Sequence, residues 1–258
     1  MKEKLTIVKV GGKIVEDEAS LQRLILAFAR MDGLRLLVHG GGRTATDVAN
    51  RLGVESVMVE GRRVTDQAML EVVTMVYGGL VNKRVVAALQ AAGINAIGLT
   101  GADMNVMLAH RRPAGNVDYG FVGDVDKADG EALARLLQSG VVPVMAPLTH
   151  DGHGQLLNTN ADTIAGETAK ALAHLFDVTL VYCFEHAGVL KDANDEASLI
   201  PTIHRASFEA LVADGTVSGG MIPKIENCLQ AVEQGVARVV ITAADALGTD
   251  SGTVITQH

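Results

Sequence analysis

The chain has 258 residues, of which 48% are hydrophobic and 3% are aromatic, and it contains no tryptophan. This length allows one large domain with a substantial core or two closely packed lobes. The formal net charge of −8 and the shortage of aromatic side chains argue against proteins that bind a nucleic-acid backbone or stack single-stranded bases.

Two cysteines, Cys183 and Cys228, lie in apolar segments and have no CxxC spacing. We expect them to fill the core of a reduced cytoplasmic protein rather than to bind a metal or form a disulfide framework. The first residues, MKEKLTIVKV, contain no apolar run of signal-peptide length, and no run of about 18 apolar residues follows. The sequence therefore predicts a soluble protein without a membrane partner.

The first half of the chain alternates short β-branched runs with helical patterns. Strands are predicted at residues 5–10 and 34–38, each followed by glycines and a helix, the first at 18–29 and the second around Val48 and Leu52. A long helix at 70–91 precedes a strand at 96–99. Residues 104–124 combine strand-like fragments with Pro113 and glycines, which suggests hairpins over the edge of a sheet.

The same alternation continues to the end of the chain. Further strands are predicted at 141–146, 178–184 and 237–242, and further helices at 129–139, 160–174, 207–212 and 222–234. The pattern is typical of an α/β protein. We expect a three-layer αβα sandwich with a mainly parallel central sheet, formed by a single domain over residues 1–258.

The segment QLLNTNADTIAGETAKAL, residues 155–172, places two amides and a carboxylate directly ahead of a helix. Asn158 and Asn160 suit an N-terminal cap, and Asp162 falls in or just before the first turn. A carboxylate beside free backbone N–H groups can hold cations or orient charged neighbours. An ordinary capped helix would explain the same residues.

Glycine turns end the first two predicted strands, at residues 11–12 and 40–42. Open α/β sheets bind ligands at this end, where glycine lets backbone N–H groups approach an anion. Tight strand-to-helix turns also need glycine for steric reasons, and neither turn fits GxGxxG or GxxxxGK[ST]. Lys9 is a single charge in the otherwise apolar first strand, so we expect it to face the ligand crevice rather than a solvent-exposed edge.

The segment GGMIPK, residues 219–224, predicts a glycine turn followed by a helix with Pro223 at its first position. Lys224 would lie in the first turn, where the helix dipole disfavours a cation unless an anion is bound nearby. The alternative is a surface lysine. A glycine turn, a helix N-terminus and a lysine together favour a phosphate site.

Six segments resemble the amino acid kinase family. They are VKVGG (8–12), VHGGG (38–42), GRRVT (61–65), VNK (81–83), LLNTNADTIAGETA (156–169) and GGMIPK (219–224), and they occur in the family's order over nearly the whole chain. The NxNAD and GMxxK elements resemble the branch that phosphorylates N-acylated glutamate in arginine biosynthesis. This resemblance implies a lobe 1–170 that binds the acylamino acid and dimerises, and a lobe 171–258 that binds ATP, closing over Mg²⁺.

The resemblance also implies roles for individual residues. Lys9 and Lys224 would flank the transferred phosphoryl group, with Asp162 orienting both lysines. The substrate would be held by Gly41, Gly42, Arg63 and Asn158, and the phosphates of ATP by Gly11, Gly12, Glu185 and Gly220. Relatives usually carry a Ser/Thr–Asp pair where this chain has Phe184 and Glu185, so Glu185 is expected to replace the aspartate while Phe184 removes a hydroxyl.

The chemistry of such a transfer fits this inventory. The γ-carboxylate of the substrate has a reference pKa of about 4.3 and is ionised at neutral pH, so no general base is needed. Lysines, glycine N–H groups and Mg²⁺ neutralise charge on the phosphoryl oxygens. Because Mg²⁺ keeps waters and phosphate oxygens as ligands, no metal-ligand cluster from the protein is expected. His39, before the triple glycine, is expected to be structural.

Several alternatives stay open. An enzyme of the same fold acting on aspartate, carbamate or a nucleotide should lack the combination of Arg63, Asn158 and Asp162, and a non-catalytic amino-acid sensor should lack one of the two lysines or Asp162. A dinucleotide-dependent oxidoreductase is disfavoured because GxGxxG is missing.

The acyl group of the substrate and the assembly of the protein are further open questions. The acyl group could be acetyl or succinyl. A succinyl group carries one more carboxylate, which would need a cation such as Lys13 or Arg43 in the pocket, with Arg62, Arg111 and Arg112 as weaker candidates. We expect a homodimer built through the N-terminal lobe and the apolar face of its 70–91 helix. Feedback-inhibited relatives use an N-terminal helix to link dimers into hexamers, and the first strand here begins only a few residues after Met1, so we also expect insensitivity to arginine.

Overall fold

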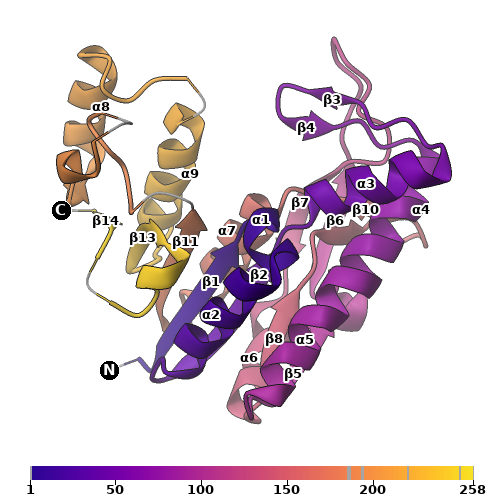
Figure 1. Ribbon diagram of the computed structural model, residues 1–258, viewed down its shortest axis with the longest axis horizontal. Helices are drawn as coiled ribbons and strands as arrows, with labels where there is room; N and C mark the ends of the chain where they lie inside the picture. The colour runs from indigo at the N-terminus through magenta and orange to yellow at the C-terminus, as the bar shows by residue number, and fades with distance from the viewer. Residues whose placement is uncertain (1, 185–186, 193–194, 220, 250, 258) are drawn as a thin grey trace.

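The computed structural model describes residues 2–184, 187–192, 195–219, 221–249 and 251–257. Its centre is an eight-stranded sheet in the order β12-β14-β13-β11-β1-β2-β8-β5 (Figure 1). All neighbouring pairs are parallel except β13 and β14. The strands are β1 (Lys4–Val10), β2 (Leu34–His39), β5 (Ala96–Leu99), β8 (Val142–Met145), β11 (Asp177–Phe184), β12 (Thr202–Ile203), β13 (Arg238–Ala243) and β14 (Thr253–Ile255).

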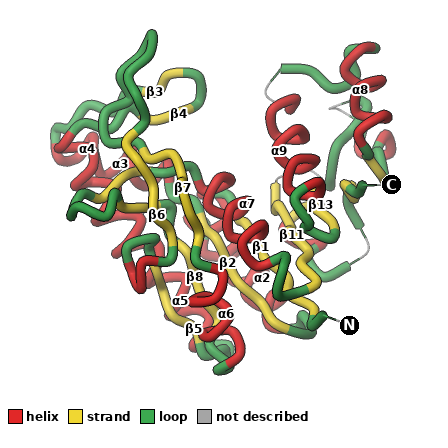
Figure 2. The backbone as a smooth tube through the Cα atoms, turned by 180° about the vertical axis from the view of Figure 1, so that it is seen from behind, coloured by secondary structure: helices red, strands yellow, loops and turns green. Residues whose placement is uncertain are grey.

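Helices cover both faces of this sheet, which confirms the expected three-layer architecture. One face packs against α1 (Gly12–Glu16), α2 (Glu18–Ala29), α3 (Gly42–Leu52), α4 (Gln67–Val73), the π-helix η1 (Thr74–Val81) and α5 (Asn82–Ala91). The other face packs against α6 (Gly130–Gln138), α7 (Ala161–Leu172), α8 (Arg205–Ala213) and α9 (Met221–Glu233). Figure 2, which views the molecule from behind Figure 1, looks onto this second face, with α7 beside β1 and β2.

Strand β1 lies in the middle of the sheet and is buried on both sides. Leu5 and Ile7 belong to the core beneath α6–α9, while Val8 and Val10 belong to the core beneath α1–α5. Because side chains alternate along a strand, Lys9 points to the same face as Leu5 and Ile7. This is the face on which α7 packs.

Smaller sheets lie at one end of the large one. A four-stranded sheet has the order β10-β9-β6-β7, and a two-stranded hairpin pairs β3 with β4. In Figure 1 the β3–β4 hairpin projects beyond α3. The strands are β3 (Met58–Val59), β4 (Arg62–Arg63), β6 (Met107–Arg111), β7 (Gly123–Ala128), β9 (Leu148–His150) and β10 (Leu156–Asn158). The antiparallel pairing of β6 and β7 confirms that residues 104–124 belong to a hairpin.

Three local expectations differ from the structure. Leu52 is 58% exposed, and the buried positions of α3 are Ala45 and Ala49, so the core-facing side of this helix carries its small residues. Asn158 belongs to β10, so only Asn160 caps α7, accepting a hydrogen bond from the Asp162 N–H at 2.7 Å. Pro223 is the third residue of α9, which the helix tolerates because N–H groups of the first turn have no intrahelical partner.

The continuous helix from Gln67 to Ala91 is long and apolar enough, by length and composition alone, to cross a membrane. Its buried side chains, among them Val73, Val85 and Leu89, are part of the core beneath the large sheet. Core helices of soluble proteins share these features, so the helix is only a weak indication of a membrane span. The expected long helix is present, but its middle is a π-helix rather than an α-helix.

Candidate active site

The ends of β1 and β2 lie side by side at the centre of the site. Each strand leads into one of the two glycine turns, and the Gly40 N–H donates to the Val10 carbonyl at 3.0 Å. A Cβ atom on Gly40 would lie 3.0 Å from the Gly12 nitrogen, and one on Gly12 would lie 3.3 Å from the Gly41 nitrogen. A larger residue at either position would push the two turns apart by a few tenths of an ångström, because they pack backbone against backbone.

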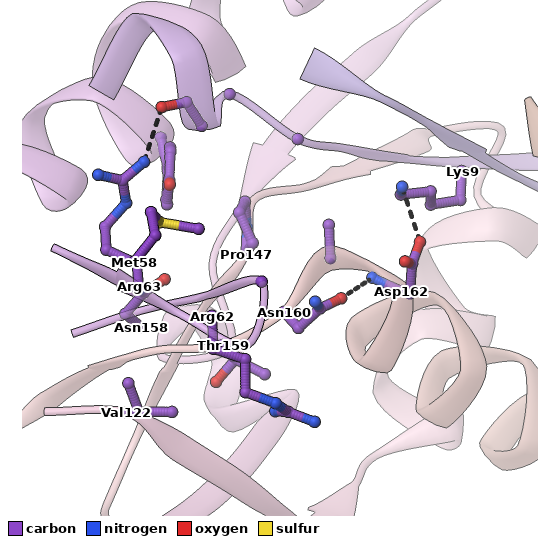
Figure 3. A pocket seen from close by; sticks show the side chains of 16 residues that line it. Lys9, Met58, Arg62, Arg63, Val122, Pro147, Asn158, Thr159, Asn160 and Asp162 are labelled. Carbon is purple, nitrogen blue, oxygen red and sulfur yellow. Dashed lines mark hydrogen bonds and ion pairs between the residues drawn. The ribbon is translucent and has the colours of Figure 1, made fainter. Parts of the chain in front are cut away.

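Lys9 and Asp162 form an ion pair at this edge of the sheet. The Lys9 Nζ lies 2.7 Å from Asp162 Oδ1, and Lys9 is 8% exposed (Figure 3). The Asn160 cap fixes the first turn of α7 and thereby the position of Asp162. The structure thus brings together two residues that are 153 positions apart in the chain. Lys9 faces the crevice, as its place in an apolar strand predicted.

A first pocket of about 230 Å³ opens beside this ion pair. Its walls come from β1, the second glycine turn, the β3–β4 hairpin, η1 and the segment between β10 and α7. The lining residues are Lys9, Gly40, Gly41, Gly42, Met58, Gly61, Arg62, Arg63, Tyr77, Val122, Pro147, Asn158, Thr159, Asn160, Ala161 and Asp162. All four residues expected to hold the substrate, Gly41, Gly42, Arg63 and Asn158, therefore line one pocket.

The guanidinium of Arg63 is fixed before any ligand arrives. Its Nη2 donates to the Gly42 carbonyl at 2.8 Å and to Thr46 Oγ1 at 3.0 Å, and its Nη1 donates to Ser56 Oγ. Arg63 is 8% exposed, and Figure 3 shows it on the side of the pocket opposite Lys9. A buried, oriented guanidinium is well suited to bind a carboxylate.

Two further residues complete the walls of the first pocket. Asn158 donates a hydrogen bond to Thr65 Oγ1 at 2.9 Å. Tyr77 is 6% exposed and packs under Gly41, where an added Cβ would lie 3.1 Å from the ring. Burial raises the pKa of the Tyr77 phenol, an effect that nearby Arg63 partly offsets. Tyr77 belongs to none of the sequence motifs of the site, although a polar aromatic side chain in an apolar helix is a usable signal.

A second pocket, of about 280 Å³, lies on the other side of the first glycine turn. It is lined by Gly11, Gly12, Lys13, Ile14, Cys183, Phe184, Gly188, Met221, Lys224 and Ile241. Lys224, from the first turn of α9, therefore faces the same space as the first glycine turn. Glu185 and Gly220, which were expected to contact the nucleotide, lie outside the described residues.

The structure separates the two cations selected for the acyl group. Lys13 lines the second pocket, and Arg43, in the first turn of α3, is exposed and is not among the residues described as lining the first. Arg62, from strand β4, lines the first pocket instead (Figure 3). Lys13, Arg43 and Arg62 belong to α1, α3 and β4, so the packing of these elements decides which side chain lines which pocket, and nearness to a glycine turn in the sequence does not reveal it.

One buried histidine and two buried cysteines near the site are held in their neutral forms. Burial lowers the pKa of His39 to about 4, and its ring contacts the Gly40 carbonyl and the Asn82 side chain. Burial raises the pKa of Cys183 and of Cys228 to about 12. These side chains therefore serve as core and support rather than as nucleophiles. Within the described part of the chain, no group of three or more His, Cys, Asp or Glu residues could hold a metal ion.

A mainly parallel sheet whose strand ends carry glycine turns, with a lysine–carboxylate pair in one of two pockets beside these strands, is typical of α/β enzymes that bind phosphate. Residues 4–243 match the family model described as the amino acid kinase family. The chain therefore belongs to the amino acid kinase family, which confirms the resemblance seen in the sequence.

Relatives of known name agree with this assignment. The chain is 65% identical over 255 residues to a protein of Bacteroides thetaiotaomicron named acetylglutamate kinase, covering 99% of each chain. It is 41% identical to a Methanopyrus kandleri protein of the same name, covering 97% of this chain and 100% of that one. Both names fit the expected kinase activity.

Solved structures agree on the fold. A Streptococcus mutans protein superposes with a TM-score of 0.80 at 27% identity, covering 98% of this chain and 99% of that one. Carbamate kinase from Giardia lamblia superposes with a TM-score of 0.72 at 13% identity, covering 100% and 99% of the two chains, and so shows the fold alone.

Proposed function

We propose that the protein transfers the γ-phosphoryl group of ATP to the γ-carboxylate of an N-acylated L-glutamate, and that the resulting acyl phosphate serves arginine biosynthesis. The observation that carries this proposal is the Lys9–Asp162 ion pair, which lines a pocket that also contains the fixed guanidinium of Arg63. Arg63 offers a partner for one substrate carboxylate, and Lys9 offers a cation at the reacting one.

The two pockets divide the ligands between them. The first would bind the acylamino acid, and the second, with Gly11, Gly12 and Lys224, would bind the phosphates of ATP. This division supports the assignment of residues 1–170 to the acylamino acid and of 171–258 to ATP, although Gly11 and Gly12 of the first segment also line the second pocket. Because Lys9 lines one pocket and Lys224 the other, the phosphoryl group would pass between the two lysines.

In the reaction, an oxygen of the ionised γ-carboxylate attacks the γ-phosphorus as the bond to the ADP oxygen breaks. Charge spreads over the three equatorial oxygens, and the ammonium groups of Lys9 and Lys224 would stabilise it. Asp162 would keep Lys9 charged and directed at the phosphoryl group. Mg²⁺ would enter with the nucleotide, bound through phosphate oxygens and water, and would supply further charge neutralisation.

The test is the formation of an acyl phosphate. Purified protein incubated with ATP, Mg²⁺ and N-acetylglutamate should give a product that hydroxylamine traps as a hydroxamate. Free glutamate should react poorly, since an ammonium group replaces the neutral amide. Lys224→Ala should lower kcat by about 10²–10³-fold, because the lost charge acts mainly on the transition state. Equal turnover in this variant would remove Lys224 from the mechanism.

A second form of the substrate is favoured by one specific observation. Arg62 lines the first pocket, and an extra cation there could bind the additional carboxylate of N-succinylglutamate. We propose comparing kcat/KM for N-acetyl- and N-succinyl-glutamate in wild type, Arg62→Ala and Arg43→Ala, with Lys13→Ala for the other pocket. An acetyl preference that none of these substitutions changes would exclude a succinyl enzyme, whereas a selective loss of succinyl activity in Arg62→Ala would establish one.

We further propose that the protein is a cytoplasmic homodimer. Met75 and Leu80 of η1 are 53% and 55% exposed, and Ile97 on the edge strand β5 is 39% exposed. Apolar side chains so placed suit an interface between two copies. Light scattering should give twice the chain mass for wild type and the chain mass for Met75→Glu/Leu80→Glu, and a monomeric wild type would contradict the proposal.

A further inference from the structure

Phe184 is the last residue of β11, the strand that pairs with β1. In this pairing Lys9 lies opposite Tyr182, and alternation along β11 puts Tyr182 and Phe184 on the same face of the sheet. The two rings stack with centroids 6.1 Å apart and planes 14° apart. The Tyr182 hydroxyl donates to the Asp162 carbonyl at 3.3 Å, so this stack is anchored to the first turn of α7.

Both lysines of the proposed transfer site contact the Phe184 ring. The Nζ of Lys224 lies 4.8 Å from the ring centroid, and the Nζ of Lys9 lies 5.7 Å from it. Both distances fall within the range in which an ammonium group is attracted by the negative face of an aromatic ring. A leucine of similar volume would fill the space but would offer no such attraction.

The position of the ring makes this contact relevant to the reaction. Phe184 lines the second pocket together with Lys224, and it also contacts Lys9, which lines the first. The ring therefore belongs to the wall of the second pocket and also lies beside a lysine of the first. In the part of the chain that the structure describes, both ammonium groups lie near this ring, and the carboxylate of Asp162 is in direct contact with Lys9. Lys224 is exposed and comes from another helix, so its long side chain needs a partner to stay in place.

We propose that Phe184 is a positioning residue whose ring holds in place the ammonium groups of Lys9, from the first pocket, and Lys224, from the second, before the phosphoryl group arrives. This inference rests on the proposed function, because it assigns the ring a role in that transfer. When the side chains of both lysines are already held in place, less conformational ordering is needed to reach the transition state. Loss of the ring should therefore lower kcat more than it changes the KM for the acylated glutamate.

Substitutions of matched size test the aromatic face separately from packing. Phe184→Leu should lower kcat about tenfold and change the KM for N-acetylglutamate less than about twofold, and Phe184→Tyr should stay within about twofold of wild type. Phenylalanines carrying one, two and three ring fluorines, incorporated at position 184, should lower kcat in that order, because fluorine withdraws charge from the ring face while the shape is kept. Phe208→Leu, a core position that lines neither pocket, should leave kcat unchanged.

A second measurement detects the contact without activity. In NMR spectra of lysine-labelled protein, the Cε protons of Lys224 should be shifted upfield by the ring in wild type and Phe184→Tyr, and the shift should disappear in Phe184→Leu. If the wild-type protein shows the upfield Lys224 shifts but forms no hydroxamate, the proposed function is refuted and the contact between Lys224 and the ring is retained. Equal kcat across the fluorinated series, in protein that unfolds at the wild-type urea concentration, would refute the positioning role.

Discussion

Replacing Asp162 by asparagine keeps the shape of the side chain and removes the charge that faces Lys9. The side chain of Lys9 is 9% exposed, and that of Asp162 is 31% exposed. Removing one partner of a fully buried pair costs about 3–5 kcal/mol, because the other charge is left uncompensated, whereas exposed pairs contribute about 0–1 kcal/mol. With one partner buried and the other about one third accessible, we expect Asp162→Asn to lower the free energy of unfolding by about 2 kcal/mol.

The same substitution should affect catalysis more strongly. Lys9 would no longer be held toward the reacting groups, and kcat should fall about 10²–10³-fold, which corresponds to about 3–4 kcal/mol of transition-state stabilisation. Urea unfolding would measure the first effect, and hydroxamate formation the second.

The double variant Lys9→Met/Asp162→Asn separates the two effects. It has no uncompensated charge, so its stability should return to within about 1 kcal/mol of wild type, while its activity should stay lost. Unchanged stability and kcat in Asp162→Asn would show that the ion pair has neither role. Recovery of activity in the double variant would show that the pair acts only through folding.

Three further outcomes are expected. Gly130→Ala should destabilise the fold by about 3 kcal/mol or more, because its Cβ would lie 2.3 Å from the carbonyl oxygen of Ala171, whereas Gly115→Ala, with nothing within 4 Å, should change the urea midpoint little. Burial lowers the pKa of His39 to about 4 in the folded protein, from an ordinary 6.5. The unfolded chain therefore binds the proton first as the pH falls, and urea titrations should show up to about 3 kcal/mol of stability lost between pH 6.5 and 4, with a smaller loss in His39→Gln. Arg63→Lys should raise the KM for N-acetylglutamate about 10–100-fold with a smaller effect on kcat, since one ammonium group cannot reproduce the hydrogen bonds of a fixed guanidinium; an unchanged KM in steady-state assays would contradict the role of Arg63 in substrate binding.

The sequence by itself determined the order of the main elements and the class of fold. Strand β1 was predictable because its β-branched run is buried on both faces, and α2 was predictable because its apolar residues follow the helical period. The unusual position of Lys9 within an apolar strand also indicated, without any structure, that its side chain faces a ligand site. Such features depend on neighbours within a few residues along the chain.

The tertiary structure alone decided which side chains share a pocket. Lys13 directly follows one motif of the site and Arg62 lies within another, yet Lys13 lines the second pocket and Arg62 the first. Likewise, nothing near Phe184 in the sequence shows that its ring contacts Lys9 and Lys224, because those contacts join β11 to β1 and α9. Local periodicity fixes the face of an element on which a residue lies, whereas the partner on that face is set by strand order and helix packing across the whole chain.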